Sequence, residues 1–302
     1  MTSPLRISLF GAGVFAGYHA AKVAAHERTV LATVYDPDPD AAQTLADRHG
    51  AAVATSAEAA IDACDAVICA APAIYHKTVC VPALAAGRHA LIEKPLADTP
   101  DSARAISAAA QHGGGEVQVG HQERIVAEAI GLHRIPERPE QIEIVRHCAR
   151  SQRNTDTSIV MDMMVHDIDL LLALYGAPEW VSTEAARRIY SNHLDAVRAE
   201  LGFAGGLTAY VSSSRDADPE RRWRLRFASG TVDIDFAAKT LRHDTPFNLD
   251  ADFGQRADVR DNLAAAFDRF VAACLDGAPP LCTLQDGLEA VLVCDAIEKD
   301  AP

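Results

Sequence analysis

Three residues of this 302-residue chain have the types and spacing that suit acid–base chemistry. Asp162 and His166 are four residues apart among apolar neighbours, so on a helix they share one face. A carboxylate beside an imidazole in partly dry surroundings can orient the ring and raise its basicity. Lys94 precedes Pro95, which stiffens the loop and can fix the direction of the lysine. Taken one at a time, these features also fit a salt bridge on a helix surface and an ordinary loop lysine.

A glycine-rich turn near the start of the chain is suited to hold a dinucleotide. The run Gly11-Ala-Gly13-Val-Phe-Ala16 is the G-x-G-x-x-A fingerprint, whose first glycine allows a tight turn and whose second lets a pyrophosphate approach the backbone. Asp36 follows at about the 20-residue distance of the carboxylate that binds the ribose hydroxyls. It would repel the 2′-phosphate of NADP, and no arginine follows it, so the sequence favours NAD over NADP. The alternative is a turn with only a structural role.

Alternating strand and helix patterns in residues 1–120 must position these groups. Helical patterns at 14–26, 40–49, 75–86 and from Thr99-Pro100 onward separate short apolar runs at 5–10, 30–35, 66–71, 89–92 and 116–119. This alternation predicts an α/β Rossmann domain with a doubly wound parallel sheet, which would bind NAD. Ligands bind at the carboxyl edge of such a sheet, where Asp36 and Lys94 would then lie.

The pattern changes after Gly120, which places a domain boundary there. A long helical pattern covers 159–175, and strand-like runs occupy 141–149, 180–189, 196–203, 207–213, 223–227 and 231–236. Residues 121–302 are therefore predicted to form a substrate-binding and oligomerisation domain, an α+β domain with an open, mostly antiparallel sheet. Helical patterns at 262–275 and 287–297 close the chain, and the C-terminal helix is free to pack back on the first domain. A symmetric partner would cover the open sheet face, so we expect a homodimer or a homotetramer.

The composition excludes several classes of protein. The formal net charge is −14, and a field of that sign repels nucleic acids and anionic membrane surfaces. No apolar stretch approaches the roughly 20 residues that span a bilayer. The first residues lack a signal-peptide pattern, so we expect a cytoplasmic protein. The seven cysteines are scattered without a C-x-x-C pair, which indicates reduced thiols and no metal site.

Four segments, taken together, resemble the Gfo/Idh/MocA family of sugar dehydrogenases. They follow one another in the family's order: Gly11-Ala-Gly13 through His19, Ala71-Pro72 through His76, Glu93-Lys94-Pro95, and Asp162 with His166. The resemblance implies an NAD-dependent oxidoreductase in which Lys94, Asp162 and His166 form the catalytic group. The residues that we expect at the cofactor are Gly11, Gly13, Val14, Phe15, Asp36, Ala71, Pro72, His76, Glu93, Lys94 and His121.

The resemblance also implies roles in the oxidation of a secondary hydroxyl to a ketone. His166 would take the hydroxyl proton, Asp162 would hold the imidazole, and Lys94 would hydrogen-bond the hydroxyl oxygen and favour alkoxide character. Hydride would pass to the nicotinamide. The sequence leaves open whether Lys94 or His166 takes the proton first.

The substrate is left open between sugars, nucleotide sugars and polyols. Residues 119–124 and 160–169 resemble the UDP-N-acetylglucosamine 3-dehydrogenase branch, which implies oxidation at C3 of a UDP-N-acetylhexosamine. The chain departs from that branch at 125–127 and 146–150. The candidate substrate residues are Arg124, Arg150, Arg153 and Asp169. The alternatives are an inositol or free-sugar dehydrogenase and, in another class, a non-catalytic NAD-binding sensor or regulator.

Overall fold

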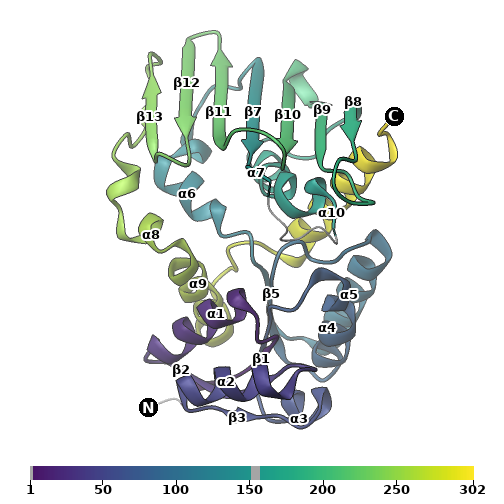
Figure 1. Cartoon of the computed structure of the whole chain (residues 1–302). Helices are drawn as coiled ribbons and strands as arrows, with labels where there is room; N and C mark the ends of the chain where they lie inside the picture. Colours follow the sequence, from purple (N-terminus) through teal and green to yellow (C-terminus); the bar gives the residue numbers. More distant parts are fainter. Residues whose placement is uncertain (1–2, 151–156) are drawn as a thin grey trace. The chain divides into compact units, whose positions relative to one another are not determined.

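The computed structural model describes residues 3–150 and 157–302, and the chain divides into two compact units (Figure 1). The first unit contains the chain up to Gln122 together with Leu263–Leu288. The second contains Glu123–Asn262 and Glu289–Pro302. The sequence analysis assigned 121–302 to the second domain and left the C-terminal helix free to pack back on the first, whereas residues 263–288 lie in the first unit and residues 289–302 in the second.

A parallel six-stranded sheet forms the centre of the first unit. Its strands, in spatial order, are β3 (Ala52–Val53), β2 (Thr29–Tyr35), β1 (Leu5–Phe10), β4 (Ala66–Cys69), β5 (His89–Ile92) and β6 (Val117–Val119). The helices between them are α1 (Val14–Ala25), α2 (Pro39–His49), α3 (Ala57–Asp62), α4 (His76–Ala85) and α5 (Pro100–Gly113). The strand order confirms the doubly wound sheet. It reverses between β1 and β4, and the ends of strands at such a switch point form a ligand crevice.

Local signals set the ends of the helices in this unit. Asp38 caps α2, because its side chain accepts hydrogen bonds from the backbone N–H groups of Asp40 and Ala41. Thr99 caps α5 through Ser102 N–H, and Pro100 occupies the first turn, as the sequence predicted. The short β3 and α3 were not predicted, because neither is long enough to show a period.

A helix from the last third of the chain completes the core of the first unit. Phe267, Phe270 and Val271 of α9 (Asn262–Asp276) are buried in the same cluster as Leu9 and Ile68 of the sheet. The segment after α9 continues along the sheet edge, where Val119 N–H donates to the carbonyl of Cys282 at 3.0 Å. The apolar spacing predicted the helix but not its partner, because periodicity shows that a face is buried and not against what.

A seven-stranded sheet forms the second unit. Its strands, in spatial order, are β13 (Thr240–His243), β12 (Gly230–Asp235), β11 (Glu220–Phe227), β7 (Gln141–His147), β10 (Thr208–Ser214), β9 (Ala196–Gly202) and β8 (Trp180–Arg187). Only β7 and β10 run parallel, so the sheet is mostly antiparallel as expected. β13 and α6 were not predicted, since both are short.

Helices cover one face of this sheet. They are α6 (Glu123–Ile130), α7 (Val165–Tyr175) and α10 (Leu284–Lys299) (Figure 1). The alternation along β11 shows the two faces: Trp223 and Leu225 are buried, whereas Arg222, Arg224 and Arg226 are exposed. The remaining short elements are α8 (Ala257–Arg260) and the 3₁₀ turns Ala73–Tyr75, Leu132–Arg134, Ala204–Gly206 and Phe253–Gln255.

The segment that carries Asp162 opens with a π-helical turn. Val160–Met164 are π-helical, and α7 begins at Val165, whereas the sequence predicted a continuous α-helix over 159–175. The residues around this turn are nearly all apolar, so their spacing does not show the extra residue that a π turn contains. Such turns are frequently found at functional sites. In the part of the chain that the structure describes, no helix is long and apolar enough to cross a bilayer.

Candidate active site

The glycine turn of the first unit leaves an open cradle at the start of α1. Gly11 has φ +104°, and a Cβ there would lie 2.9 Å from the carbonyl oxygen of Ala70, so no other residue fits without strain. Gly13 begins the helix without a side-chain cap, and a Cβ added to it would meet nothing within 4 Å. The N–H groups of the first turn therefore face open space, which suits a pyrophosphate.

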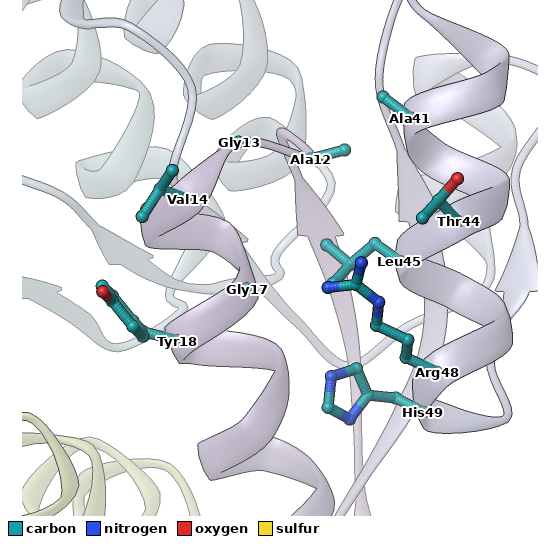
Figure 2. A pocket seen from close by; sticks show the side chains of 10 residues that line it. All are labelled: Ala12, Gly13, Val14, Gly17, Tyr18, Ala41, Thr44, Leu45, Arg48 and His49. Carbon is teal, nitrogen blue, oxygen red and sulfur yellow. The ribbon is translucent and has the colours of Figure 1, made fainter. Parts of the chain in front are cut away.

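This turn borders a cavity of about 570 Å³ between α1 and α2 (Figure 2). The glycine turn and the first helix line it with Ala12, Gly13, Val14, Gly17 and Tyr18, and the second helix lines it with Ala41, Thr44, Leu45, Arg48 and His49. Val14 and Phe15 are exposed at the start of α1, although both are apolar. Exposed apolar side chains next to an anion cradle fit a ligand that has both charged and aromatic parts.

Asp36 is fastened to the glycine turn. One oxygen of its carboxylate accepts from Ala12 N–H at 2.8 Å, and the other accepts from Asp38 N–H at 2.9 Å. Each carboxylate oxygen has a second lone pair, so the side chain keeps capacity for two ribose hydroxyls. The cradle and this carboxylate fit NAD, which Gly11, Gly13 and Asp36 would hold.

A buried ion pair fixes the loop that carries Lys94. Glu93 Oε1 lies 2.7 Å from His19 Nε2, and its other oxygen accepts from the backbone N–H of Lys94 at 3.2 Å. Burial raises the pKa of Glu93, but His19 and Lys94 outweigh it and hold that pKa below its usual value. A Cβ on Gly120 would lie 3.0 Å from this carboxylate. Glu93 was predicted to contact the cofactor. In the structure its carboxylate contacts His19 and the Lys94 backbone and lies close to Gly120, so it links three segments of the chain.

His76 and His121 lie in the same unit and are both buried. The ring nitrogens of His76 lie 2.9 Å from the carbonyl of Ala71 and 3.2 Å from that of Leu96. The imidazole therefore fixes the turn of Ala71 and Pro72 at the end of β4. His121 follows β6 at the carboxyl edge of the sheet.

His166 belongs to the second unit, where it faces a buried network of charges. Its Nδ1 lies 3.5 Å from Glu123 Oε1, at the first residue of α6. Two Arg146 nitrogens donate to the Glu123 carboxylate at 2.8 and 3.1 Å, and Arg221 also pairs with it. Arg146 further donates to Asp167 at 2.5 and 3.0 Å. The network thus joins α6, α7, β7 and β11.

The electrostatics of this network keep Glu123 ionised. Burial alone would raise the pKa of Glu123, but Arg146, His166 and Arg221 together hold it far below its usual range. Burial likewise opposes the charge of Arg146, and the carboxylates of Asp167 and Glu123 raise its pKa. An ionised carboxylate favours the charged form of a neighbouring imidazole. The arrangement can therefore stabilise a proton that His166 accepts.

The other residues predicted at the substrate lie in different surroundings. Arg124 and Asp169 form a mostly buried two-pronged ion pair with distances of 2.7 to 3.2 Å, so each charge is opposed by the other. The exposed guanidinium of Arg150 lies 3.9 Å from the centre of the Tyr190 ring. Arg153 lies outside the described residues. Asp162 is half-buried in the π turn, one turn before His166.

The predicted catalytic residues come from both units. Lys94 belongs to the first, and Asp162 and His166 belong to the second. Sequence reasoning missed Glu123, which faces His166, and Arg146, which holds Glu123. The available signal was an acid four residues after the end of the last Rossmann strand, together with an arginine in a strand whose alternate residues are apolar. Within residues 3–150 and 157–302, no cluster of three or more His, Cys, Asp or Glu could hold a metal ion.

The fold and the glycine cradle define an oxidoreductase with a nicotinamide-binding Rossmann domain. Residues 5–121 match the family described as "Oxidoreductase family, NAD-binding Rossmann fold", and residues 134–233 match the "GFO/IDH/MocA C-terminal domain". The chain belongs to the Gfo/Idh/MocA family of oxidoreductases, sugar dehydrogenases that act on CH–OH groups.

Individual relatives are similar over different lengths. UDP-N-acetylglucosamine 3-dehydrogenase from Acidithiobacillus ferrooxidans is 28% identical over 287 residues, which are 92% of this chain and 91% of that protein. One solved structure of that enzyme has a TM-score of 0.89 and covers 99% of this chain and 98% of its own. Inositol 2-dehydrogenase from Corynebacterium glutamicum is 32% identical over 59% of this chain and 56% of its own length.

A more distant structure shares the fold. The WlbA dehydrogenase from Bordetella pertussis, in complex with NADH and UDP-GlcNAcA, has a TM-score of 0.88 at 21% identity. The comparison covers all of this chain and 96% of that one.

Proposed function

We propose that this protein is an NAD-dependent dehydrogenase that oxidises a secondary hydroxyl of a nucleotide sugar, C3 of a UDP-N-acetylhexosamine. The observation that carries the chemistry is the half-buried His166 imidazole, set one turn after Asp162 and 3.5 Å from an ionised carboxylate. The likeness to a UDP-N-acetylglucosamine 3-dehydrogenase along 92% of the chain supports the substrate.

Two side chains of the protein act on the hydroxyl group, and a third holds one of them. His166 takes the hydroxyl proton on its ring, and neighbouring carboxylates stabilise the charged imidazole that results. Asp162 holds the imidazole from within the same helical segment. Lys94 donates a hydrogen bond to the oxygen as it gains negative charge. NAD, when bound, accepts the hydride that leaves the carbon.

The same proposal includes the cofactor preference, the location and the oligomeric state of the enzyme. We propose that NAD is preferred over NADP, because Asp36 would repel a 2′-phosphate. We propose a cytoplasmic homodimer or homotetramer that covers the exposed face of the second sheet, and light scattering on a sizing column would give its mass. A monomer would contradict this part of the proposal.

A neutral polyol is the second candidate substrate. Arg124, one of the cations predicted to meet a diphosphate, is opposed by Asp169 within the same ion pair. An arginine already balanced by a carboxylate adds less to the binding of a diphosphate, which favours an inositol or a free sugar. The likeness to inositol 2-dehydrogenase over 59% of the chain agrees with that alternative.

The test is an activity panel that follows NADH formation from NAD with UDP-N-acetylglucosamine, UDP-N-acetylgalactosamine, myo-inositol and free hexoses. We expect turnover with a UDP-N-acetylhexosamine. Turnover only with the inositol or a hexose would select the second candidate. NADH binding without reaction across the panel would indicate a non-catalytic sensor.

The Lys94→Ala variant tests the catalytic group. We expect NADH binding to persist and turnover to fall by at least about 10²-fold, because the developing alkoxide loses a charged donor. The matched control is Lys299→Ala, since Lys299 is 74% exposed and forms an ion pair with Asp295 one turn earlier in α10. Equal turnover of Lys94→Ala and Lys299→Ala would remove Lys94 from the catalytic group.

A further inference from the structure

We propose that Glu123 is a positioning residue for His166: its carboxylate faces the imidazole at 3.5 Å and stabilises the proton that the ring accepts. This inference rests on the proposed function, in which His166 is the base. It adds a carboxylate from another helix to the one that the family resemblance implied, Asp162.

The position of Glu123 is set from several sides. It is the first residue of α6, and its side chain is 9% exposed. Arg146 of β7 holds both carboxylate oxygens, at 3.1 and 2.8 Å, and Arg221 of β11 contacts one of them. A carboxylate held by a two-pronged arginine has little rotational freedom. Glu123 is therefore a rigid support, and not a flexible surface acid that happens to lie near a histidine.

The same network also fixes the helix that carries His166. The next residue, Asp167, accepts two hydrogen bonds from Arg146 and one from Trp223 Nε1 at 2.8 Å. Arg146 thus links the helix of the imidazole to the carboxylate that faces it. This double anchorage sets the distance between the ring and Glu123 by buried contacts.

The charges of the network balance without His166. Glu123 and Asp167 carry two negative charges, and Arg146 and Arg221 carry two positive charges. The network contains the His166 imidazole, Glu123 from α6, Arg146 from β7, Arg221 from β11 and Asp167 from α7, and Asp162 precedes His166 by four residues in the same segment. Of these groups, the imidazole is the one whose charge changes near neutral pH. Removal of Glu123 would leave it facing two guanidinium groups with one fewer carboxylate.

The consequence is a coupled effect on rate and pH dependence. A carboxylate 3.5 Å from Nδ1 favours the imidazolium over the neutral ring. Without it the imidazole is a weaker base, so the maximal rate falls. The acidic limb of the rate profile moves to lower pH at the same time, because the ring loses its proton more readily.

The test compares Glu123→Gln, which removes the charge and keeps the shape, with the wild-type enzyme. NMR of the histidine rings gives the titration midpoint of His166 without any turnover, and His166→Asn identifies its signal. We expect the midpoint to fall by at least about one pH unit. We expect kcat to fall by about 10²-fold while KM stays within about threefold, since positioning of a base acts on the chemical step.

Two further variants separate positioning from folding. Asp233→Asn is the control, because Asp233 also pairs with an arginine, Arg224, on the exposed side of β11 and β12. Glu123→Asp keeps the charge on a shorter side chain. We expect its kcat and its His166 titration midpoint to lie between those of the wild type and those of Glu123→Gln. If Glu123→Gln does not fold, Glu123→Asp carries the test, with a midpoint below that of the wild type as the supporting result.

Different results would contradict the role of Glu123 and the role of His166 as the base. A His166 midpoint in the Glu123 variants equal to that of Asp233→Asn would overturn the role of Glu123. Unchanged turnover in His166→Asn would instead reject His166 as the base, whatever the midpoint of the ring.

Discussion

The two units each contain a histidine beside a glutamate. The two pairs differ in distance and exposure, which distinguishes a structural contact from a proposed catalytic base. In the first unit His19 is 1% exposed and lies 2.7 Å from Glu93, in a contact that locks the Lys94 loop. In the second unit His166 is 14% exposed and lies 3.5 Å from Glu123, which two arginines hold. A tight, enclosed pair stabilises a loop, whereas a looser pair with access can exchange a proton. The residue types alone do not show this difference.

The largest expected effect concerns the arginine that supports the second pair. Arg146→Ala would leave Glu123 and Asp167 as buried carboxylates without their main partner. We expect the second unit to lose about 3–5 kcal/mol of stability, seen by calorimetry. Arg224 is half-exposed, so Arg224→Ala should lower the free energy of unfolding by less than about 1 kcal/mol. Similar losses in the two variants would show that the network is not the support of the second unit.

Replacement of each histidine by asparagine gives the next largest expected effect. His166→Asn should lower turnover by about 10²–10⁴-fold and leave NADH affinity unchanged, because it removes a base from the chemical step. His19→Asn should instead weaken NADH binding and lower the melting temperature, because it loosens the Lys94 loop. Steady-state kinetics and NADH titration measure both. Reversed results would mean that the first pair, and not the second, serves the reaction.

The smallest expected effect is on stability in acid. The pKa values of Glu93 and Glu123 are both lowered in the folded protein, so each adds stability above the unfolded value of about 4.3. That stability is lost as the pH falls from there toward the folded pKa values. We therefore expect Glu123→Gln to have a flatter dependence of melting temperature on pH below about 4.5 than the wild type. Parallel curves would show that Glu123 is not held ionised.

Much of the fold follows from local patterns in the sequence. The glycine turn, Asp36 and the cap at Thr99 are signals within a few residues, and they predicted the Rossmann unit with most of its strands. The π turn at 160–164 and the return of 263–288 to the first unit were not predictable. The first adds a residue without changing the apolar pattern, and the second depends on a partner far away in the sequence.

The sequence pointed to candidate reactive groups, which stay a prediction, and it did not point to the side chains that support them. Asp162 and His166 have a spacing that shows a shared face. Glu123 lies 43 positions before His166, and no helical or strand periodicity relates two residues so far apart. Arg146 looks like any charged residue in a strand. Buried ion pairs between distant segments depend on tertiary packing, so the sequence did not show that Arg124 and Asp169, both predicted at the substrate, pair with each other.

The measurement that tests the catalytic proposal most directly is a crystal structure with NADH and UDP-N-acetylglucosamine bound. We predict that Lys94 Nζ and His166 Nε2 both lie within about 3 Å of the oxygen on C3 of the sugar. A bound sugar whose C3 oxygen contacts neither nitrogen would contradict the account.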